Sequence, residues 1–159
     1  MNKLLIIAIL ILFNSYVNAQ KVKESFHPEK PFKQRTDTTI IGNEIHWIFQ
    51  SKPNAFVTQE YQDGEKLYKY KFRDSELRVG TINFELTFDK MNFQDSIGFE
   101  PDVFTMNFLR LEGFNEQTEE LQFFLTVNKP DTDWAFPIYL FVNLNGTSRF
   151  ELPTFEDDY

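Results

Sequence analysis

The chain has 159 residues, no cysteine, 17% aromatic residues and a formal net charge of −8 at pH 7. This length suits one domain with a sizeable core, and the absence of cysteine excludes both a disulfide framework and lipid attachment at a signal-peptide cysteine. An acidic surface repels phosphate groups and no basic cluster interrupts it, so we expect neither nucleic acid nor a membrane surface as a partner.

Residues 1–19 have the order of a secretory signal peptide. Lys3 precedes an apolar run over residues 4–13, and Val17 and Ala19 stand at positions −3 and −1 of a cleavage site. The run is too short to span a bilayer, which takes about 20 residues. We therefore expect cleavage after Ala19, export to the periplasm or the extracellular space, and no membrane span after cleavage. The alternative is an uncleaved anchor.

The remaining chain divides by its pattern. Residues 20–37 are polar, mixed in charge and without a sustained period, which predicts a flexible leader. Residues 38–154 are predicted to form a single β domain, and residues 155–159 an acidic tail.

Apolar residues alternate with polar ones throughout the predicted domain, as expected for half-buried strands. The alternation covers residues 45–49, 68–72, 81–88, 121–127 and 138–144. Turn dipeptides lie between such runs, at Gly42-Asn43, Asp63-Gly64 and Asn145-Gly146. The pattern predicts an all-β fold, an antiparallel β-sandwich or small open barrel of about eight or nine strands. Trp47 is predicted to lie in its core.

One short helix is predicted over residues 90–96. Asp89 is suited to cap its start and Gly98 to end it, with Met91 and Phe93 facing inward.

Two regions carry apolar residues on both strand faces. They are residues 103–111 and 122–127, and the same holds for Tyr139 and Phe141 in the following strand. Either these second faces are covered, or they form an exposed aromatic patch that binds something. We favour burial.

The sequence contains few residues suited to catalysis. His27 and His46 are its two histidines, and without cysteine they do not provide the three or four ligands of a typical metal site. No serine lies in a nucleophile elbow, and no glycine-rich loop suits phosphate. We expect no enzyme activity, no metal and no cofactor, with His46 a hydrogen-bonded or exposed strand residue.

The segment Asn128 to Pro137 is either a binding loop or a connection between strands. Asp131 and Asp133 begin like a calcium loop, but the later ligand positions are missing. We expect a structural crossover in which Asp131 and Thr132 form the turn and Trp134 caps the end of the core. Trp134, Asp131 and Asp133, together with Tyr139 and Phe141, are kept as weak binding candidates.

The same segment is similar to part of a known protein family. Its Pro130, Thr132, Asp133, Trp134 and Pro137, preceded by the strand over residues 121–127, resemble the C-terminal half of a domain-of-unknown-function family of small exported proteins and lipoproteins of Bacteroidetes. The hairpin over residues 56–72 resembles an earlier hairpin of that family. The resemblance implies an all-β domain and export, and no particular chemistry. Family members often begin with a lipobox cysteine, which this chain lacks.

Three functions remain open from the sequence. The first is a non-catalytic exported or envelope-associated module that binds a protein partner through a sheet face or edge. The second is a small-ligand or glycan binder, with Trp134, Tyr61 and Tyr139 stacking on sugars. The third is a hydrolase that uses two carboxylates.

Overall fold

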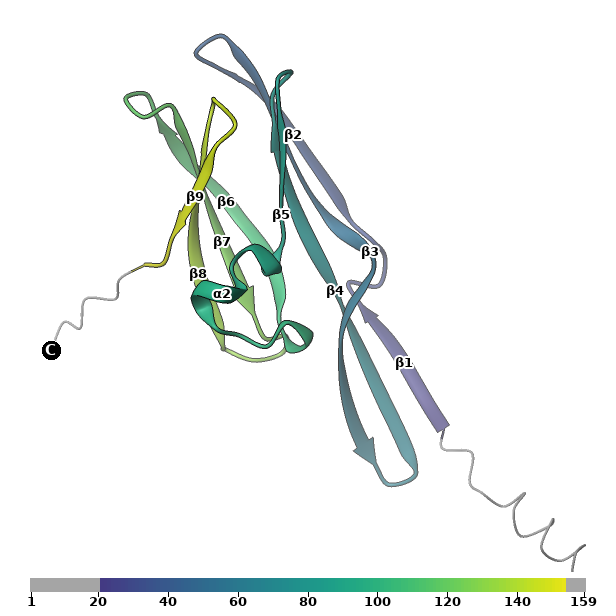
Figure 1. Cartoon of the computed structure of the whole chain (residues 1–159). Helices are drawn as coiled ribbons and strands as arrows, with labels where there is room; N and C mark the ends of the chain where they lie inside the picture. Colours follow the sequence, from purple (N-terminus) through teal and green to yellow (C-terminus); the bar gives the residue numbers. More distant parts are fainter. Residues whose placement is uncertain (1–20, 154–159) are drawn as a thin grey trace, which may run out of the picture.

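The structure is a computed structural model that describes residues 21–153. These residues form nine strands in two separate sheets (Figure 1). The all-β prediction is confirmed, and the architecture is a sandwich rather than a closed barrel.

The first sheet holds five strands in the order β1-β4-β3-β2, with β5 also paired to β4. Their bounds are β1 Lys21–His27, β2 Lys33–Ile40, β3 Asn43–Asp63, β4 Lys66–Gly80 and β5 Glu85–Phe88. β1 runs parallel to β4, whereas the other pairs are antiparallel. β1 and β5 thus lie along successive halves of the same side of β4.

The second sheet is an antiparallel meander in the order β6-β7-β8-β9. Its strands are β6 Thr105–Asn115, β7 Glu120–Asn128, β8 Ala135–Asn143 and β9 Ser148–Glu151. Buried and half-buried residues alternate strictly along β7, so one of its faces packs on the first sheet.

Three short helical turns connect the two sheets: η1 Lys90–Asn92, α2 Gln94–Ile97 and η2 Pro101–Val103. Asp89 accepts a hydrogen bond from the Met91 amide at 2.8 Å, and Gly98 ends α2 with a φ of 76°. The predicted cap and stop are therefore confirmed, but the single helix predicted over residues 90–96 is divided into η1 and α2. Phe93 is buried, but Met91 is exposed, because residues two positions apart do not share a helical face.

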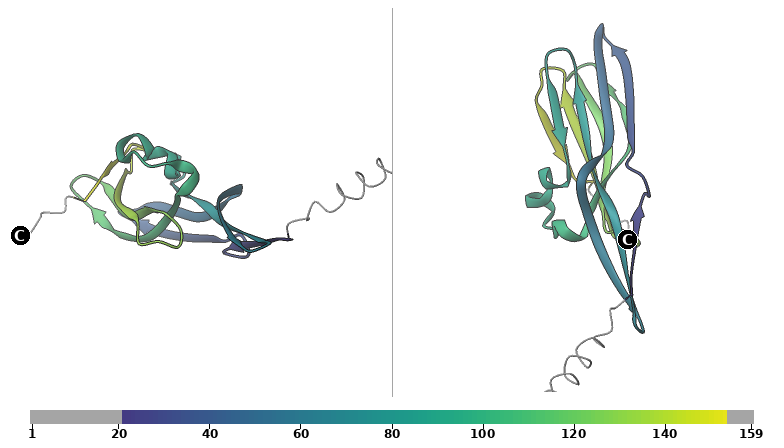
Figure 2. Two further views of the ribbon diagram at one scale, coloured as in Figure 1. Left: turned by 90° about the horizontal axis from the view of Figure 1, so that it is seen from below. Right: turned by 90° about the vertical axis from the view of Figure 1, so that its right-hand side faces the viewer.

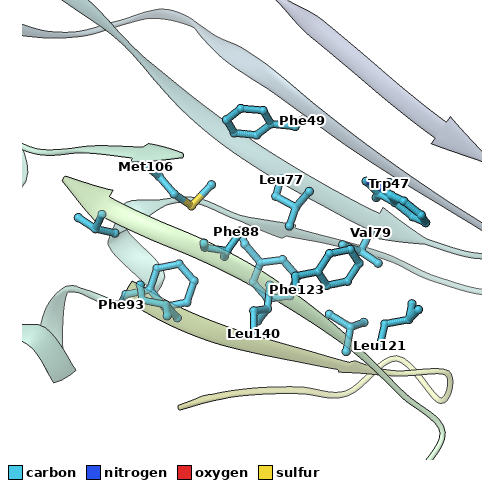
Figure 3. Packing of buried hydrophobic residues seen from close by; sticks show 14 of the residues in the cluster. Trp47, Phe49, Leu77, Val79, Phe88, Phe93, Met106, Leu121, Phe123 and Leu140 are labelled. Atoms are coloured by element: carbon cyan, nitrogen blue, oxygen red, sulfur yellow. The ribbon is translucent and has the colours of Figure 1, made fainter. Parts of the chain in front are cut away.

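The core lies between the two sheets, where aromatic and aliphatic side chains interdigitate (Figure 3). Phe123 of β7 is at its centre and meets Trp47 of β3 edge to face, with ring centroids 5.9 Å apart. Trp47 is 9% exposed, which confirms its prediction as a core residue.

A bulge divides the first sheet into two parts. Residues 52–55 of β3 lie opposite Asp74 alone on β4, and Asn54 has a left-handed φ of 55°. Beyond the bulge, β3 and β4 leave the sandwich and continue as a long hairpin with β1 alongside (Figures 1 and 2).

The predicted flexible leader is wrong. Residues 21–27 form β1 and residues 33–40 form β2, each paired along its whole length with a longer strand. Edge strands are held by backbone hydrogen bonds and cover little of the core, so they need no apolar period. The predicted signal peptide and acidic tail lie outside the described residues.

The strand predicted over residues 81–88 is shorter than its alternation suggests. Only Glu85–Phe88 pair with β4, and Ile82 is 94% exposed. The Asn83 amide donates to the Thr81 hydroxyl, and the Thr81 amide donates to the Phe84 carbonyl. These bonds close a turn, which overrides the period-two pattern.

Candidate functional site

The part of the first sheet outside the sandwich is the most distinctive surface of the protein, and we call it the arm. It comprises β1, residues 56–63 of β3 and residues 66–72 of β4, and it is one layer thick (Figure 2). No second sheet covers the outer part of the arm, so both faces of that part are open to other molecules, whereas Val57 and Phe72 at its base are buried.

One face of the arm is held by charged groups. Lys69 pairs with Glu60 at 2.6 Å, and Lys71 pairs with Glu24 at 3.0 Å. Nearer the bulge, the Arg73 guanidinium lies over the rings of Phe26 and Phe56, at 5.4 Å and 5.1 Å from their centroids. Such contacts give a single layer its order without a hydrophobic core.

The opposite face is rich in tyrosine, and we call it the tyrosine face. Tyr61 is 62% exposed and lies 6.3 Å from the half-buried Tyr68, while Tyr70 lies beside the His27 ring at 6.0 Å. At the end of the arm next to the sandwich, Gln59 donates to the Pro130 carbonyl at 2.9 Å. This contact ties the tyrosine face to the loop between β7 and β8.

The arm also has an unpaired strand edge. β2 pairs with β3 only as far as Gln50, so within residues 21–153 no strand lies against the outer side of residues 56–63. We call this side the arm edge. Its sequence, FVTQEYQD, contains no lysine or proline, two of the residues that protect open edges, and its charged residues are Glu60 and Asp63. β1, which borders the other side of the arm, carries Lys21, Lys23 and Glu24.

The hairpin turn decides which backbone groups of the arm edge are free. Asp63 and Lys66 flank the turn at Gly64-Glu65, so they form a hydrogen-bonded pair. Alternation along the ladder then directs the amide and carbonyl groups of Thr58, Glu60 and Gln62 away from β4. Both Thr58 and Gln62 are exposed. The arm edge therefore offers regularly spaced donors and acceptors to an incoming strand.

A buried ion pair anchors the point where the arm meets the sandwich. The ammonium group of Lys90 lies 3.3 Å from the Asp74 carboxylate and donates to the carbonyls of Pro101 and Phe104, at 2.6 Å and 2.7 Å. Nearby, burial lowers the pKa of Lys52, but the hydrogen bond to Asp89 and the negative charges of Asp89, Asp74 and Glu76 together outweigh burial and leave that pKa raised. Both pairs link the first sheet to the η1 region.

The segment from Asn128 to Pro137 is a hairpin loop and not a crossover, because β7 and β8 are antiparallel neighbours. The Lys129 amide donates to the Trp134 carbonyl, and Thr132 makes the turn's side-chain hydrogen bonds. Asp131 has a left-handed φ of 56°, and both it and Asp133 are exposed. The predicted turn role therefore holds for Thr132, while the structure gives Asp131 and Asp133 no common ligand geometry.

Trp134 covers the core only in part. Its ring meets the buried Phe104 edge to face at 5.7 Å, yet 57% of the residue is exposed. It borders a pocket of about 350 Å³. Half of the lining residues are aromatic, and the full set is Gly98, Phe99, Glu100, Val103, Phe104, Lys129, Trp134 and Phe136.

Tyr139 and Phe141 lie on the outer face of the second sheet, where they are half-buried. Tyr139 stacks on Phe124 with ring centroids 5.1 Å apart, and the Arg149 guanidinium lies 3.8 Å from the Phe141 centroid. Arg149 also donates twice to the Glu120 carboxylate, and this hydrogen bonding lowers the pKa of Glu120. The favoured burial is therefore only partial: neighbouring side chains cover these rings in part, and no further layer of the described residues lies over them.

His46 lies on the outer face of the first sheet, in line with Asp37, Gly80 and Glu85. Its Nε2 atom is 3.5 Å from the Glu85 carboxylate. Gly80 provides the room, since a Cβ there would lie 2.7 Å from the Phe84 carbonyl and 3.1 Å from the imidazole. Within the described residues, no group of three or more acidic or histidine side chains is arranged to hold a metal ion.

The sequence predicts the arm only in part. The alternation at Tyr68, Tyr70 and Phe72 predicted a strand, but gave no sign that a second sheet is missing there. The structure shows that β3 and β4 are much longer than the strands of the second sheet, a length that the short alternating runs over residues 45–49 and 68–72 do not indicate.

No helix in the described part of the chain has the length and apolar character needed to cross a membrane. A comparison of the sequence with protein-family models finds no match, and a comparison with curated proteins finds none either. The resemblance to the Bacteroidetes family of exported β proteins therefore stays a prediction.

Proposed function

We propose that this is an exported, non-catalytic β-sandwich protein that binds a protein partner by strand addition at the arm edge. The observation that carries the proposal is the unpaired outer side of residues 56–63, on a layer that stands clear of the sandwich. In strand addition, main-chain hydrogen bonds supply affinity and alternate side chains supply specificity.

The arm suits this role better than the sandwich does. Each added backbone hydrogen bond contributes about 0.5–1.5 kcal/mol, so several are needed for a stable complex. The arm edge presents a regular series of them, flanked on one face by Tyr61 and on the other by Glu60. Tyrosine is enriched at protein interfaces because its ring is apolar and its hydroxyl is polar.

The buried carboxylates give little support to a hydrolase. Asp74 is held by Lys90, and Glu76 accepts hydrogen bonds from Gln50 and Arg78. Both carboxylates are therefore occupied by partners within the protein, which leaves neither free to meet a substrate.

Site-specific photocrosslinking tests the proposal. A photoreactive residue at Thr58, introduced in cells that export the protein, is expected to form a discrete protein adduct. The same residue at Asn145, in the turn between β8 and β9, serves as the control and is expected to form none.

A substitution on the same edge makes the test specific for backbone pairing. With the crosslinker at Thr58, Gln62→Pro removes an outward amide and should abolish the adduct, whereas Gln62→Ala keeps the amide and should preserve it. An adduct that survives Gln62→Pro would refute strand addition.

A second candidate function is supported by the Trp134 pocket. Its volume lies in the range of small-molecule sites, and its aromatic walls suit stacking on a sugar ring. Lys129 and Glu100 provide polar groups at the same place. A glycan array with the parent protein and Trp134→Phe as the conservative control tests this: a hit lost in Trp134→Ala and kept in Trp134→Phe supports it, and an array without hits opposes it.

A further inference from the structure

We infer that the partner at the arm edge is a second copy of this chain, paired antiparallel about a two-fold axis at Gln59. The inference rests on the proposed strand addition and names its occupant. A two-fold axis makes the same edge serve both subunits, which is the commonest symmetry of protein dimers.

The charges and length of the edge select the register. With Gln59 opposite Gln59, Glu60 lies opposite Thr58 and Phe56 opposite Gln62, so no like charges face each other. Centring the axis on Glu60 would place two carboxylates side by side, which is destabilising. Centring it on Thr58 would leave the last residues before the turn without partners. The Gln59 register alone pairs the whole of residues 56–62.

The side chains of this register also match. Val57 of one copy lies opposite Tyr61 of the other, on the tyrosine face, and since Val57 is already buried in the single chain, the gain on pairing falls on the tyrosine ring. Because Tyr61 is 62% exposed in the single chain, the pairing would cover an apolar ring that is otherwise in water.

The shape of the molecule permits such a dimer. In an antiparallel pair the two sandwiches lie at opposite ends of the joined arms, since each arm extends away from its own sandwich (Figure 2). The contact would be smaller than a standard interface of about 1,600 Å², so we expect a weak dimer with a dissociation constant in the micromolar range.

Cysteine crosslinking tests the register directly, because the native chain contains no cysteine. Gln59 would sit in a non-hydrogen-bonded pair, in which opposing Cα atoms are about 4.5 Å apart and within reach of a disulfide. Under mild oxidation, Gln59→Cys should become a covalent dimer, whereas Thr58→Cys and Glu60→Cys should crosslink at least tenfold more slowly. Equal rates at all three positions, or fastest crosslinking at Glu60→Cys, would overturn the register.

Sedimentation of the native protein tests the dimer itself. The average mass is expected to rise toward that of a dimer with concentration, and to stay monomeric in Thr58→Pro and Gln62→Pro but not in Thr58→Ala. Circular dichroism and the melting temperature identify any variant that is unfolded, and two proline positions keep the comparison decisive if one of them fails to fold. A native protein that stays monomeric up to millimolar concentration would overturn the self-pairing.

The photocrosslinking experiment distinguishes the failure of the two proposals. An adduct at Thr58 with a different protein would overturn the self-pairing but support strand addition, whereas the absence of any adduct would contradict both.

Discussion

The sandwich and the arm are built from the same two strands but differ in how their side chains are covered. In the sandwich, Leu77 and Val79 of β4 are fully buried against the second sheet. In the arm, Tyr68 and Tyr70 of the same strand are only half-buried. Both stretches alternate with period two, so the alternation reports a strand and not the number of layers that cover it. The stability of the protein should therefore reside in the sandwich, and the proposed binding surface lies in the arm.

The largest expected effect is in the sandwich, from Trp47→Ala. Truncating a buried tryptophan that packs on Phe123 should lower the free energy of unfolding by about 3–5 kcal/mol, as measured by urea denaturation. The arm counterpart, Tyr61→Ala, should change it by no more than about 0.5 kcal/mol, because the ring is mostly in water. Similar losses of free energy for the two variants would show that the arm contributes as much to stability as the sandwich does.

A substitution at the boundary between the two regions should lower the free energy of unfolding nearly as much as one in the core. Asp74→Ala leaves the ammonium of Lys90 buried without its counter-ion, which should cost about 3 kcal/mol in the same urea experiment.

The double variant Asp74→Ala, Lys90→Met distinguishes the buried charge from lost packing. It should be more stable than Asp74→Ala alone, since the uncompensated charge is removed as well. If the double variant is the less stable of the two, the ion pair is not the cause.

Trp134→Ala should have an intermediate effect. The ring covers one edge of Phe104 but is largely exposed, so a loss of about 1 kcal/mol and a measurable fall in melting temperature are expected. Calcium should not alter the melting temperature of either Asp131→Ala or Asp133→Ala. A calcium-dependent rise in the parent that both variants lose would reinstate the loop as a cation site.

The smallest effect concerns the outer face of the second sheet and depends on pH. Hydrogen bonding to Arg149 holds the pKa of Glu120 below its ordinary value of 4.5. The folded-state pKa is thus lower than the unfolded one, so the stabilisation is present above pH 4.5 and is lost as the pH falls through the lowered pKa. The stability difference between the parent and Glu120→Gln should be small, because the pair is at the surface, and should vanish in acid. A difference that grows on acidification would contradict this assignment.

Much of the sandwich could be predicted from the sequence because its strands obey one rule throughout. Ile45, Trp47 and Phe49 lie buried on the face toward the second sheet, and Gly42 and Gly146 adopt the positive φ angles that their turns need. The alternation of apolar and polar residues did not reveal the edge strands β1 and β2. β1 and β2 were predicted as a flexible leader because their order comes from backbone pairing with residues distant in sequence, which leaves no local period.

The candidate site was less predictable than the fold. Trp134 was correctly placed next to the core, but its exposure depends on how a hairpin loop sits over Phe104, which no spacing reveals. The arm edge is defined by where β2 ends relative to β3, and that end is a property of strand register. The ion pair of Lys90 and Asp74 could not be predicted from the sequence, since a single lysine and a single aspartate form no pattern. The fold at the bulge brings the two together.

The parallel pairing of β1 with β4 has a consequence for the order of folding. Hairpins such as β3–β4 and β7–β8 close over short stretches of chain, whereas β1 must wait for a partner that follows two intervening strands. We expect the β3–β4 hairpin to form before β1 joins it. During refolding the chain would then pass through a stage in which the half of β4 that later carries β1 is as bare as the outer side of β3, so the protein is most prone to pair with the wrong strand before its own N-terminal strand arrives.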